Sequence, residues 1–288
     1  MRHWIAGTDW WTDCDDAVAM RLLARAAKQG EIALECVGIN ACMPYSCASL
    51  REFFRLEGLD NVRVGVDHDA TDYGGRTLYQ ERLARRSGDP FRNEQAPDAA
   101  ELYLSVLRQA AEPVEIVEIG FTQVVAAALR QAPALFAEKV AHVWMMAGKW
   151  DEPDGREYNF SAAPRTSRAA AGFVRDCPAP ITFLGFETAA DVIVGGRLNE
   201  TDHLRQVLVD HGSPNGRCAW DPMLVRAALL GDPEAAGFAC VRGEAAVDPE
   251  TGANNFFPSP DGRRRYLVKT RPNAYYENEI DRMIASET

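Results

Sequence analysis

Apolar and polar positions along the chain alternate in a way that predicts strands followed by helices. Residues 32–39 form a nearly continuous apolar run, as expected of a parallel strand that is buried on both faces. The other predicted strands are the short apolar runs at residues 3–6, 61–66, 114–119, 140–146, 181–185 and 266–269. Helical patterns cover residues 16–28, 47–57, 98–112, 124–130 and 165–175. This alternation predicts an α/β fold with a mostly parallel sheet, helices on both faces and a Rossmann-like core.

The chain shows no internal repeat, no low-complexity linker and no change of composition that marks a boundary. We therefore expect residues 1–288 to form a single domain, which is near the upper size for one core. The tail after about Gly231 has scattered proline and glycine among polar residues, and we expect it to be less regular.

The net charge of −11 argues against a nucleic-acid partner, because such proteins need a basic surface to displace counterions. The seven cysteines include no CxxC pair and several lie in apolar stretches, which suits a reducing compartment. No signal peptide and no apolar stretch long enough to span a membrane is evident. These features predict a cytoplasmic protein without a membrane partner.

Candidate chemistry is concentrated where the predicted strands end. In mostly parallel sheets, ligands bind at the carboxyl ends of the strands, in the loops that precede the helices. The segments at those positions are residues 9–16, Asn40, Thr122 and residues 146–159.

The first of these segments holds four carboxylates within eight residues: Asp9, Asp13, Asp15 and Asp16. A like-charge pair at about 4 Å costs on the order of 4 kcal/mol at an effective dielectric constant of about 20. Residues 3–20 contain no lysine or arginine, and the helix N-terminus that follows relieves only part of the repulsion. A bound divalent cation is the natural remedy. The alternative, a helix N-cap with surplus surface acids, stays open on these residues alone.

The acidic segment resembles a known motif. DWWTDCDDAVA, at residues 9–19, is similar to the N-terminal D-T-D-x-G-N-D-x-D-D-A-x-A motif of the nucleoside hydrolases of the inosine-uridine preferring type. Weaker matches follow in the same order as in that family, at residues 37–40 (VGIN), 119–123 (IGFTQ), 143–148 (VWMMAG), 157–160 (EYNF), 163–164 (AP), 180–185 (PITFLG) and 220–222 (WDP). No later match is specific by itself, but their order makes chance a poor explanation.

The resemblance implies a Ca²⁺ site and a catalytic base. Asp9 would bind the ion and also act as the general base that activates a metal-bound water. Asp16, the backbone carbonyl of Thr122 and Asp221 would complete the protein ligands of the ion. The family forms dimers and tetramers, so the resemblance also implies a homo-oligomer.

The resemblance further implies a set of substrate contacts. Asp15 and Asn40 would hold the ribose hydroxyls, and Glu157 and Asn159 the 5′ side of the sugar. Met146 would contribute a main-chain or packing contact below the sugar. These polar residues suit N-riboside cleavage, whose oxocarbenium-like transition state is stabilised by nearby carboxylates.

The chain departs from the family motif at several positions. Gly7 replaces the first aspartate, and Gly120 replaces a proline. Trp10-Trp11 replaces x-Gly, which suggests altered backbone freedom and aromatic surface in or near the pocket. Trp220 stands where many members have a histidine, so it cannot protonate a leaving base, but it can stack on one. A space-filling role for Trp220 is the alternative.

The leading hypothesis is a Ca²⁺-dependent N-ribohydrolase that tolerates purine bases and releases ribose and free base from a nucleoside. A metal-dependent phosphohydrolase with Asp9 as nucleophile would need a phosphate-binding lysine near that loop, and none is evident. The alternative is a Ca²⁺-stabilised protein that binds a sugar or nucleoside without turnover, or an inactive paralogue.

Overall fold

The computed structural model describes residues 1–11, 13–75, 77–88 and 91–285. Among these residues, nine strands form one sheet in the order β10-β9-β11-β6-β5-β4-β1-β2-β3. The strands are β1 (Arg2–Thr8), β2 (Ile32–Ile39), β3 (Arg63–Val66), β4 (Val114–Glu118), β5 (Val140–Met146), β6 (Ile181–Leu184), β9 (Phe238–Val247), β10 (Asn254–Pro258) and β11 (Arg264–Lys269). A separate antiparallel pair joins β7 (Ile193–Val194) to β8 (Arg217–Cys218).

The seven strands from β3 to β11 in this sheet are parallel. At the other end β9 runs antiparallel to both of its neighbours, β11 and β10. The first strand of the chain, β1, lies between β2 and β4, and the direction in which successive strands are added reverses there. Loops at such a reversal separate to opposite sides of the sheet and leave a crevice at its carboxyl edge. The predicted mostly parallel α/β fold is confirmed.

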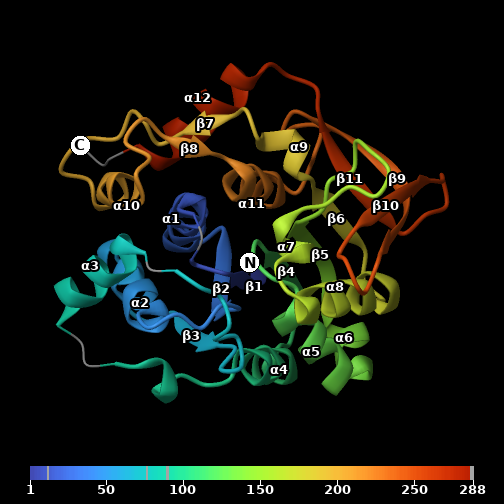
Figure 1. Cartoon of the computed structure of the whole chain (residues 1–288), viewed down its shortest axis with the longest axis horizontal. Coiled ribbons are helices and arrows are strands. Elements are labelled where there is room, and N and C mark those ends of the chain that lie inside the picture. Colours follow the sequence, from blue (N-terminus) through green and yellow to red (C-terminus); the bar gives the residue numbers. More distant parts are fainter. Residues whose placement is uncertain (12, 76, 89–90, 286–288) are drawn as a thin grey trace.

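Helices cover both faces of the sheet, because alternate residues of each inner strand point to opposite sides. Trp4 and Ala6 of β1 belong to one apolar core, whereas Ile5 belongs to the other. In Figure 1, α1, α10, α11 and α12 lie above the strands, and α4, α5, α6 and α8 lie below them. The helices are α1 (Asp15–Lys28), α2 (Ser46–Leu56), α3 (Leu78–Ser87), α4 (Ala99–Gln109), α5 (Gln123–Gln131), α6 (Pro133–Lys139), α7 (Tyr158–Ser161), α8 (Pro164–Asp176), α9 (Phe186–Ala189), α10 (His203–His211), α11 (Trp220–Leu230) and α12 (Asn273–Ile284).

Helix α1 carries acidic residues at its N-terminal end, beside the site, and basic residues at its C-terminal end. Asp15 and Asp16 occupy its first turn, and Arg25 and Lys28 occupy its last turn, which is the favourable arrangement for the helix dipole. Within the described part of the chain, no helix is both long and apolar enough to cross a membrane.

The expectation of a less regular tail is wrong. After Gly231 the chain forms β9, β10 and β11, which extend the sheet, and then the twelve-residue helix α12. Buried and exposed residues do not alternate regularly along β9, so its sequence lacks the period-two pattern of a half-buried strand. Pairing with β11 and β10 on its two sides, rather than local pattern, determines this strand.

Candidate active site

The acidic loop lies at the carboxyl end of β1, at the point where the strand order reverses. It leads directly into α1, so Asp15 and Asp16 sit at a helix N-terminus. Ile119 follows the neighbouring strand β4, and Met146 is the last residue of the next strand, β5. Three strand ends therefore meet at one place, as expected of the carboxyl edge of a parallel sheet.

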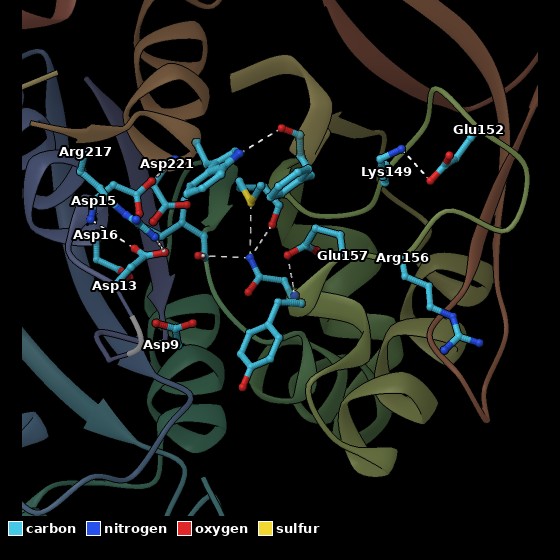
Figure 2. Close-up of a pocket in the computed structure, with 16 residues that line it drawn as sticks. Asp9, Asp13, Asp15, Asp16, Lys149, Glu152, Arg156, Glu157, Arg217 and Asp221 are labelled. Atoms are coloured by element: carbon cyan, nitrogen blue, oxygen red, sulfur yellow. Dashed lines mark hydrogen bonds and ion pairs between the residues drawn. The ribbon is translucent and has the colours of Figure 1, made fainter. Parts of the chain in front are cut away.

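A cavity of about 650 Å³ opens at this edge. Its lining is formed by Asp9, Asp13, Asp15, Asp16, Ile119, Met146, Lys149, Glu152, Arg156, Glu157, Tyr158, Asn159, Phe186, Arg217, Trp220 and Asp221. Figure 2 shows the aspartates gathered on one side, Glu157 facing them, and Lys149, Glu152 and Arg156 farther out. We call the five aspartates the acidic wall. We call Lys149, Glu152, Arg156, Phe186 and Trp220 the outer wall.

The carboxylates of the acidic wall are close together. Asp13, Asp15 and Asp16 each offer an oxygen within 4.8 Å of the others. The carboxylate of Asp15 accepts a hydrogen bond at 3.0 Å from the main-chain N–H of Asp221, which lies in the first turn of α11. The carboxylate of Asp9 accepts the N–H of Trp11 at 3.1 Å. The first turn of α1, the start of α11 and the end of β1 thus converge on one point.

Burial and mutual repulsion raise the pKa of most of these carboxyl groups. The pKa of Asp16 rises to about 7, first because of burial and then because of the Asp13 charge. The pKa values of Asp9, Asp15 and Asp221 are raised well above the ordinary range, first by burial and then by a neighbouring carboxylate, which is Asp16 for Asp9 and Asp221 and Asp13 for Asp15. Proteins show such clusters of shifted groups mainly at functional sites.

Asp13 is the exception on this wall. Burial opposes its ionisation, but a hydrogen bond with Asp15 and the charge of Arg217 lower its pKa overall. Its carboxylate forms an ion pair of 3.2 Å with the Arg217 guanidinium. One arginine cannot neutralise five carboxylates, so the acidic wall as a whole fits a hard divalent cation with oxygen ligands.

The wall that faces the aspartates is built around Glu157. One oxygen of its carboxylate accepts the N–H of Asn159 at 2.7 Å, and the other accepts the N–H of Gly148 at 3.0 Å. Burial raises the pKa of Glu157 to about 7, although these N–H groups act in the opposite direction. The side-chain amide of Asn159 donates to the carbonyl of Met146 at 2.8 Å. Both side chains are therefore held in fixed orientations at the cavity wall.

Aromatic side chains form part of the outer wall. The rings of Phe186 and Trp220 stack with centroids 5.2 Å apart and an interplanar angle of 23°. The indole N–H of Trp220 donates to the carbonyl of Phe186 at 2.9 Å, and the Arg217 guanidinium lies 5.3 Å from the centre of the indole ring. Phe186 is 39% exposed, so the stacked pair offers an apolar face to the cavity.

Comparisons with known proteins bear on the fold that carries this cavity. No protein-family model and no curated protein matches the sequence. Among solved structures, an inosine-uridine preferring nucleoside hydrolase from Bacillus anthracis is 18% identical over 99% of both chains, with a TM-score of 0.73. A plant nucleoside hydrolase, PpNRh1, is 14% identical over 99% of both chains, with a TM-score of 0.76. A type III effector protein, XopQ, in complex with adenosine diphosphate ribose, is 14% identical over 98% of this chain and 93% of that chain, with a TM-score of 0.68.

The agreement covers nearly the whole length of all three proteins. This chain has the nucleoside hydrolase fold. The resemblance that the acidic motif suggested is confirmed at the level of the fold, and the acidic loop of this nucleoside hydrolase fold lies at the end of its central strand β1.

Eight of the ten residues predicted for the site line its cavity: Asp9, Asp15, Asp16, Met146, Glu157, Asn159, Trp220 and Asp221. The other two, Asn40 and Thr122, are fully buried and do not line it. The carbonyl of Thr122 accepts the N–H of Ala126 at 3.0 Å at the start of α5. After β4 in this nucleoside hydrolase fold, Ile119 lines the cavity instead.

Asn40 lies beneath the cavity and joins two strand ends. Its side-chain amide donates to the carboxyl group of Glu118 at 2.8 Å, and its side-chain oxygen accepts the N–H of Phe121 at 2.8 Å. Its own N–H donates to the carbonyl of Thr8 at 2.9 Å. With these partners, Asn40 supports the site from below.

The two tryptophans of the acidic loop, from which aromatic surface in or near the pocket was expected, do not line the cavity, although Asp9 beside them does. Trp10 is fully buried among Phe53 and Tyr79, and its indole N–H donates to Ser49 at 2.9 Å. Trp10 rather than Trp11 has the left-handed backbone, with φ of 48°. Packing of both rings into apolar cores anchors the loop.

Sequence reasoning missed several residues of the site. Arg217 and Phe186 come from short elements without a recognisable motif, and Glu118 ends a strand that reads as apolar. For Glu118, the available signal was a glutamate within a strand predicted to be buried. Burial of a charged side chain is costly, so such a residue is expected to have specific partners.

Proposed function

We propose that this protein is a metal-dependent N-ribohydrolase that tolerates purine bases. It cleaves the N-glycosidic bond of a nucleoside and releases ribose and free base. The observation that carries the proposal is one cavity, in the nucleoside hydrolase fold, in which five aspartates face Glu157 and Asn159. A polar set of this density suits a ribose, whose hydroxyls all need partners. The stacked aromatic pair suits an adjoining base.

The metal in this proposal is Ca²⁺, held by Asp9, Asp16 and Asp221. A main-chain carbonyl beyond β4 completes the set; Thr122 is the residue implied by the motif, and Ile119 is the one that lines the cavity. A bound Ca²⁺ ion would supply one thing here, a lower pKa for the attacking water.

Asp9 acts as the general base in this scheme. It takes a proton from the attacking water while the water oxygen forms a bond to C1′ of the ribose. The bond from C1′ to the base nitrogen breaks, and its electron pair leaves on the base, which is then protonated from solvent. Without a metal ion, burial and the Asp16 charge raise the pKa of Asp9. A bound cation would lower that pKa and keep the carboxylate ionised, as the role of base requires.

The remaining residues hold the substrate. Asp15 binds ribose hydroxyls, and Glu157 and Asn159 bind the 5′ side of the sugar. The carboxylates of both walls also favour the positive charge that develops on the ribose in the transition state. Trp220 and Phe186 provide a surface on which the leaving base stacks, and stacking is worth about 1 kcal/mol beyond burial.

The test is direct. The protein is incubated with inosine, adenosine, guanosine, uridine and cytidine, with and without EDTA, and free ribose is measured as reducing sugar. We expect release of ribose that EDTA abolishes and added Ca²⁺ restores. Absence of reducing sugar from all five nucleosides, despite bound Ca²⁺, would overturn the proposal.

A second candidate is a protein that binds a sugar or nucleoside, stabilised by Ca²⁺, without turnover. The effector XopQ, which shares this fold, was solved with adenosine diphosphate ribose, and Lys149 and Arg156 place two cations on the cavity lining of this chain. Calorimetric titration with adenosine diphosphate ribose and with inosine separates the two candidates. Tight binding of either compound without release of any product favours the second. Homo-oligomer formation and a cytoplasmic location stay predictions from the sequence.

A further inference from the structure

Glu118, the last residue of β4, lies beneath the acidic loop. Its side chain is fully buried, and its position in the sheet is directly beside Gly7 of β1. A Cβ atom at residue 7 would overlap the Glu118 carboxyl group. The chain can therefore have a side chain at residue 7 or the observed Glu118 conformation, but not both. Gly7 is also the position at which the acidic motif departs from its relatives by lacking an aspartate.

The Glu118 carboxyl group connects the ends of three strands. It accepts the side-chain amide of Asn40, at the end of β2, at 2.8 Å. Asn40 in turn accepts the N–H of Phe121, beyond β4, and donates its own N–H to the carbonyl of Thr8, the last residue of β1. The hydroxyl of Thr8 donates to the carboxylate of Asp16. Glu118 is thus linked to an aspartate of the acidic wall by hydrogen bonds at the side chain and backbone of Asn40 and at the backbone and side chain of Thr8.

The second oxygen of Glu118 is buried and has no hydrogen-bond partner among the described residues. Burial raises the pKa of Glu118 to about 8, and the Asp16 charge adds to the shift. A buried carboxyl group with an unmet oxygen destabilises a fold and requires an explanation. If stability of the core were the only requirement, an apolar residue at the end of β4 would be more favourable than Glu118.

We propose that Glu118 is the positioning residue of the acidic loop, and that it supplies from β4 the carboxyl group that residue 7 of β1 lacks. It holds Asn40 directly, and through Asn40 and Thr8 it acts on the orientation of Asp16 toward the cavity. This inference rests on the proposed function in so far as the acidic wall is the metal site.

The experiment is an exchange of the carboxyl group between strands. Ca²⁺ affinity is measured by calorimetry, and melting temperature and kcat are measured in parallel, for the wild type, Glu118→Ala and the double variant Glu118→Ala/Gly7→Asp. We expect Glu118→Ala to bind Ca²⁺ at least tenfold more weakly and to lose kcat more than it raises KM. The double variant should recover Ca²⁺ affinity to within threefold of the wild type.

Two single variants are the matched controls. Gly7→Asp alone should lower the melting temperature, because its side chain overlaps Glu118. Glu115→Ala removes a glutamate from the opposite end of the same strand, where it pairs with Arg2 at 2.7 Å. It should leave Ca²⁺ affinity unchanged, so that a loss specific to Glu118 is not a general effect of altering β4.

The outcomes are decisive in each direction. Wild-type Ca²⁺ affinity in Glu118→Ala, or no recovery in a folded double variant, overturns the proposal. If the double variant does not fold, Glu118→Gln decides: it keeps an acceptor for Asn40, so near-wild-type affinity supports the proposal and a loss equal to that of Glu118→Ala overturns it. A wild type that binds no Ca²⁺ overturns the metal site and this role together. The expected affinities without ribose release would support Glu118 and refute the hydrolase.

Discussion

Buried hydrogen-bond partners hold the aspartates of the acidic wall, whereas ion pairs at the surface hold charged residues of the outer wall. Asp15 and Asp16 are 2% and 3% exposed, and Thr8, Trp10 and Asp221 hold them through hydrogen bonds. On the outer wall, Lys149 pairs with Asp151 at 2.9 Å and with Glu152 at 2.6 Å, in a loop beyond β5. The acidic wall depends on buried partners, whereas Lys149 and Glu152 of the outer wall depend on partners in their own surface loop.

This difference separates chemistry from selectivity. Atoms that must hold their positions during a reaction gain from fixed, buried partners. Side chains that meet a variable part of a ligand can change without disturbing the core. We therefore expect changes in the acidic wall to affect turnover of every substrate, and changes in the outer wall to affect the choice among substrates.

The largest effect is expected for Asp9→Asn. Loss of the general base should lower kcat by about 10³-fold. The amide oxygen can still accept the N–H of Trp11, so the melting temperature should not fall. Steady-state kinetics with the best nucleoside substrate measures the change.

Asp13→Asn is the control on the same loop, and it also tests which carboxylates hold the metal. A decrease in kcat of less than tenfold fits a metal ion held by Asp9, Asp16 and Asp221. A loss as large as that of Asp9→Asn would instead favour the compact group of Asp13, Asp15 and Asp16.

Glu157→Gln should have the next largest effect, a decrease of about 100-fold in kcat/KM for ribonucleosides. The amide cannot accept both the N–H of Asn159 and the N–H of Gly148, and it carries no charge to stabilise the ribose. The decrease should shrink with 5′-deoxynucleosides, which lack the group that Glu157 is proposed to hold. Glu152→Gln, on the outer wall, is the control and should stay within twofold of the wild type. An equal decrease for both substrate types would refute the 5′ assignment.

Removal of metal should make stability depend on pH through the acidic wall. Burial raises the folded-state pKa of Asp16 and Glu157 to about 7, above the unfolded value, so their contribution is present at low pH and is lost as pH rises through 7. In EDTA, the melting temperature should fall by about 5 °C between pH 6 and pH 8. His142, whose pKa burial lowers to about 4, acts in the opposite direction mainly below that range. Added Ca²⁺ should raise the melting temperature more at pH 8 than at pH 6, and a flat profile in EDTA would argue against this electrostatic picture.

Trp220→Ala should have the smallest effect, because the outer wall contributes selectivity. Loss of stacking is worth about 1 kcal/mol and should raise KM for inosine by about fivefold to tenfold. KM for uridine should change less, because its ring is smaller. Trp220→Phe keeps an aromatic face beside Phe186 and should recover most of the loss. If kcat falls as steeply as it does in Asp9→Asn, the distinction between the two walls is wrong.

The sequence was most informative where local pattern and local chemistry agree. The apolar runs at residues 32–39 and 140–146 predict β2 and β5 with correct bounds. The acidic loop could be recognised because repulsion among its carboxylates is a property of adjacent residues. Both depend on near neighbours in the chain, which a sequence displays directly.

Features that depend on distant partners could not be predicted in this way. Glu118 and Asn40 become a pair only when β4 and β2 flank β1, and β9 is a strand because β10 and β11 lie on either side of it. Sequence alone also could not show that Asn40 faces Phe121 rather than the cavity. Side-chain direction at a strand end depends on the turn that follows, and that turn depends on the neighbouring strand.

The central position of β1 has a consequence for folding during synthesis on the ribosome. Asp15 and Asp221 meet across 206 residues of chain, and synthesis at about 5 to 20 residues per second takes about 10 to 40 seconds to cover that distance. Throughout this interval the acidic loop has emerged but its distant partner has not. Under the proposed function, the two segments could therefore hold a metal ion together only late in synthesis, after residue 221 and before β9, β10 and β11 have been added to the sheet.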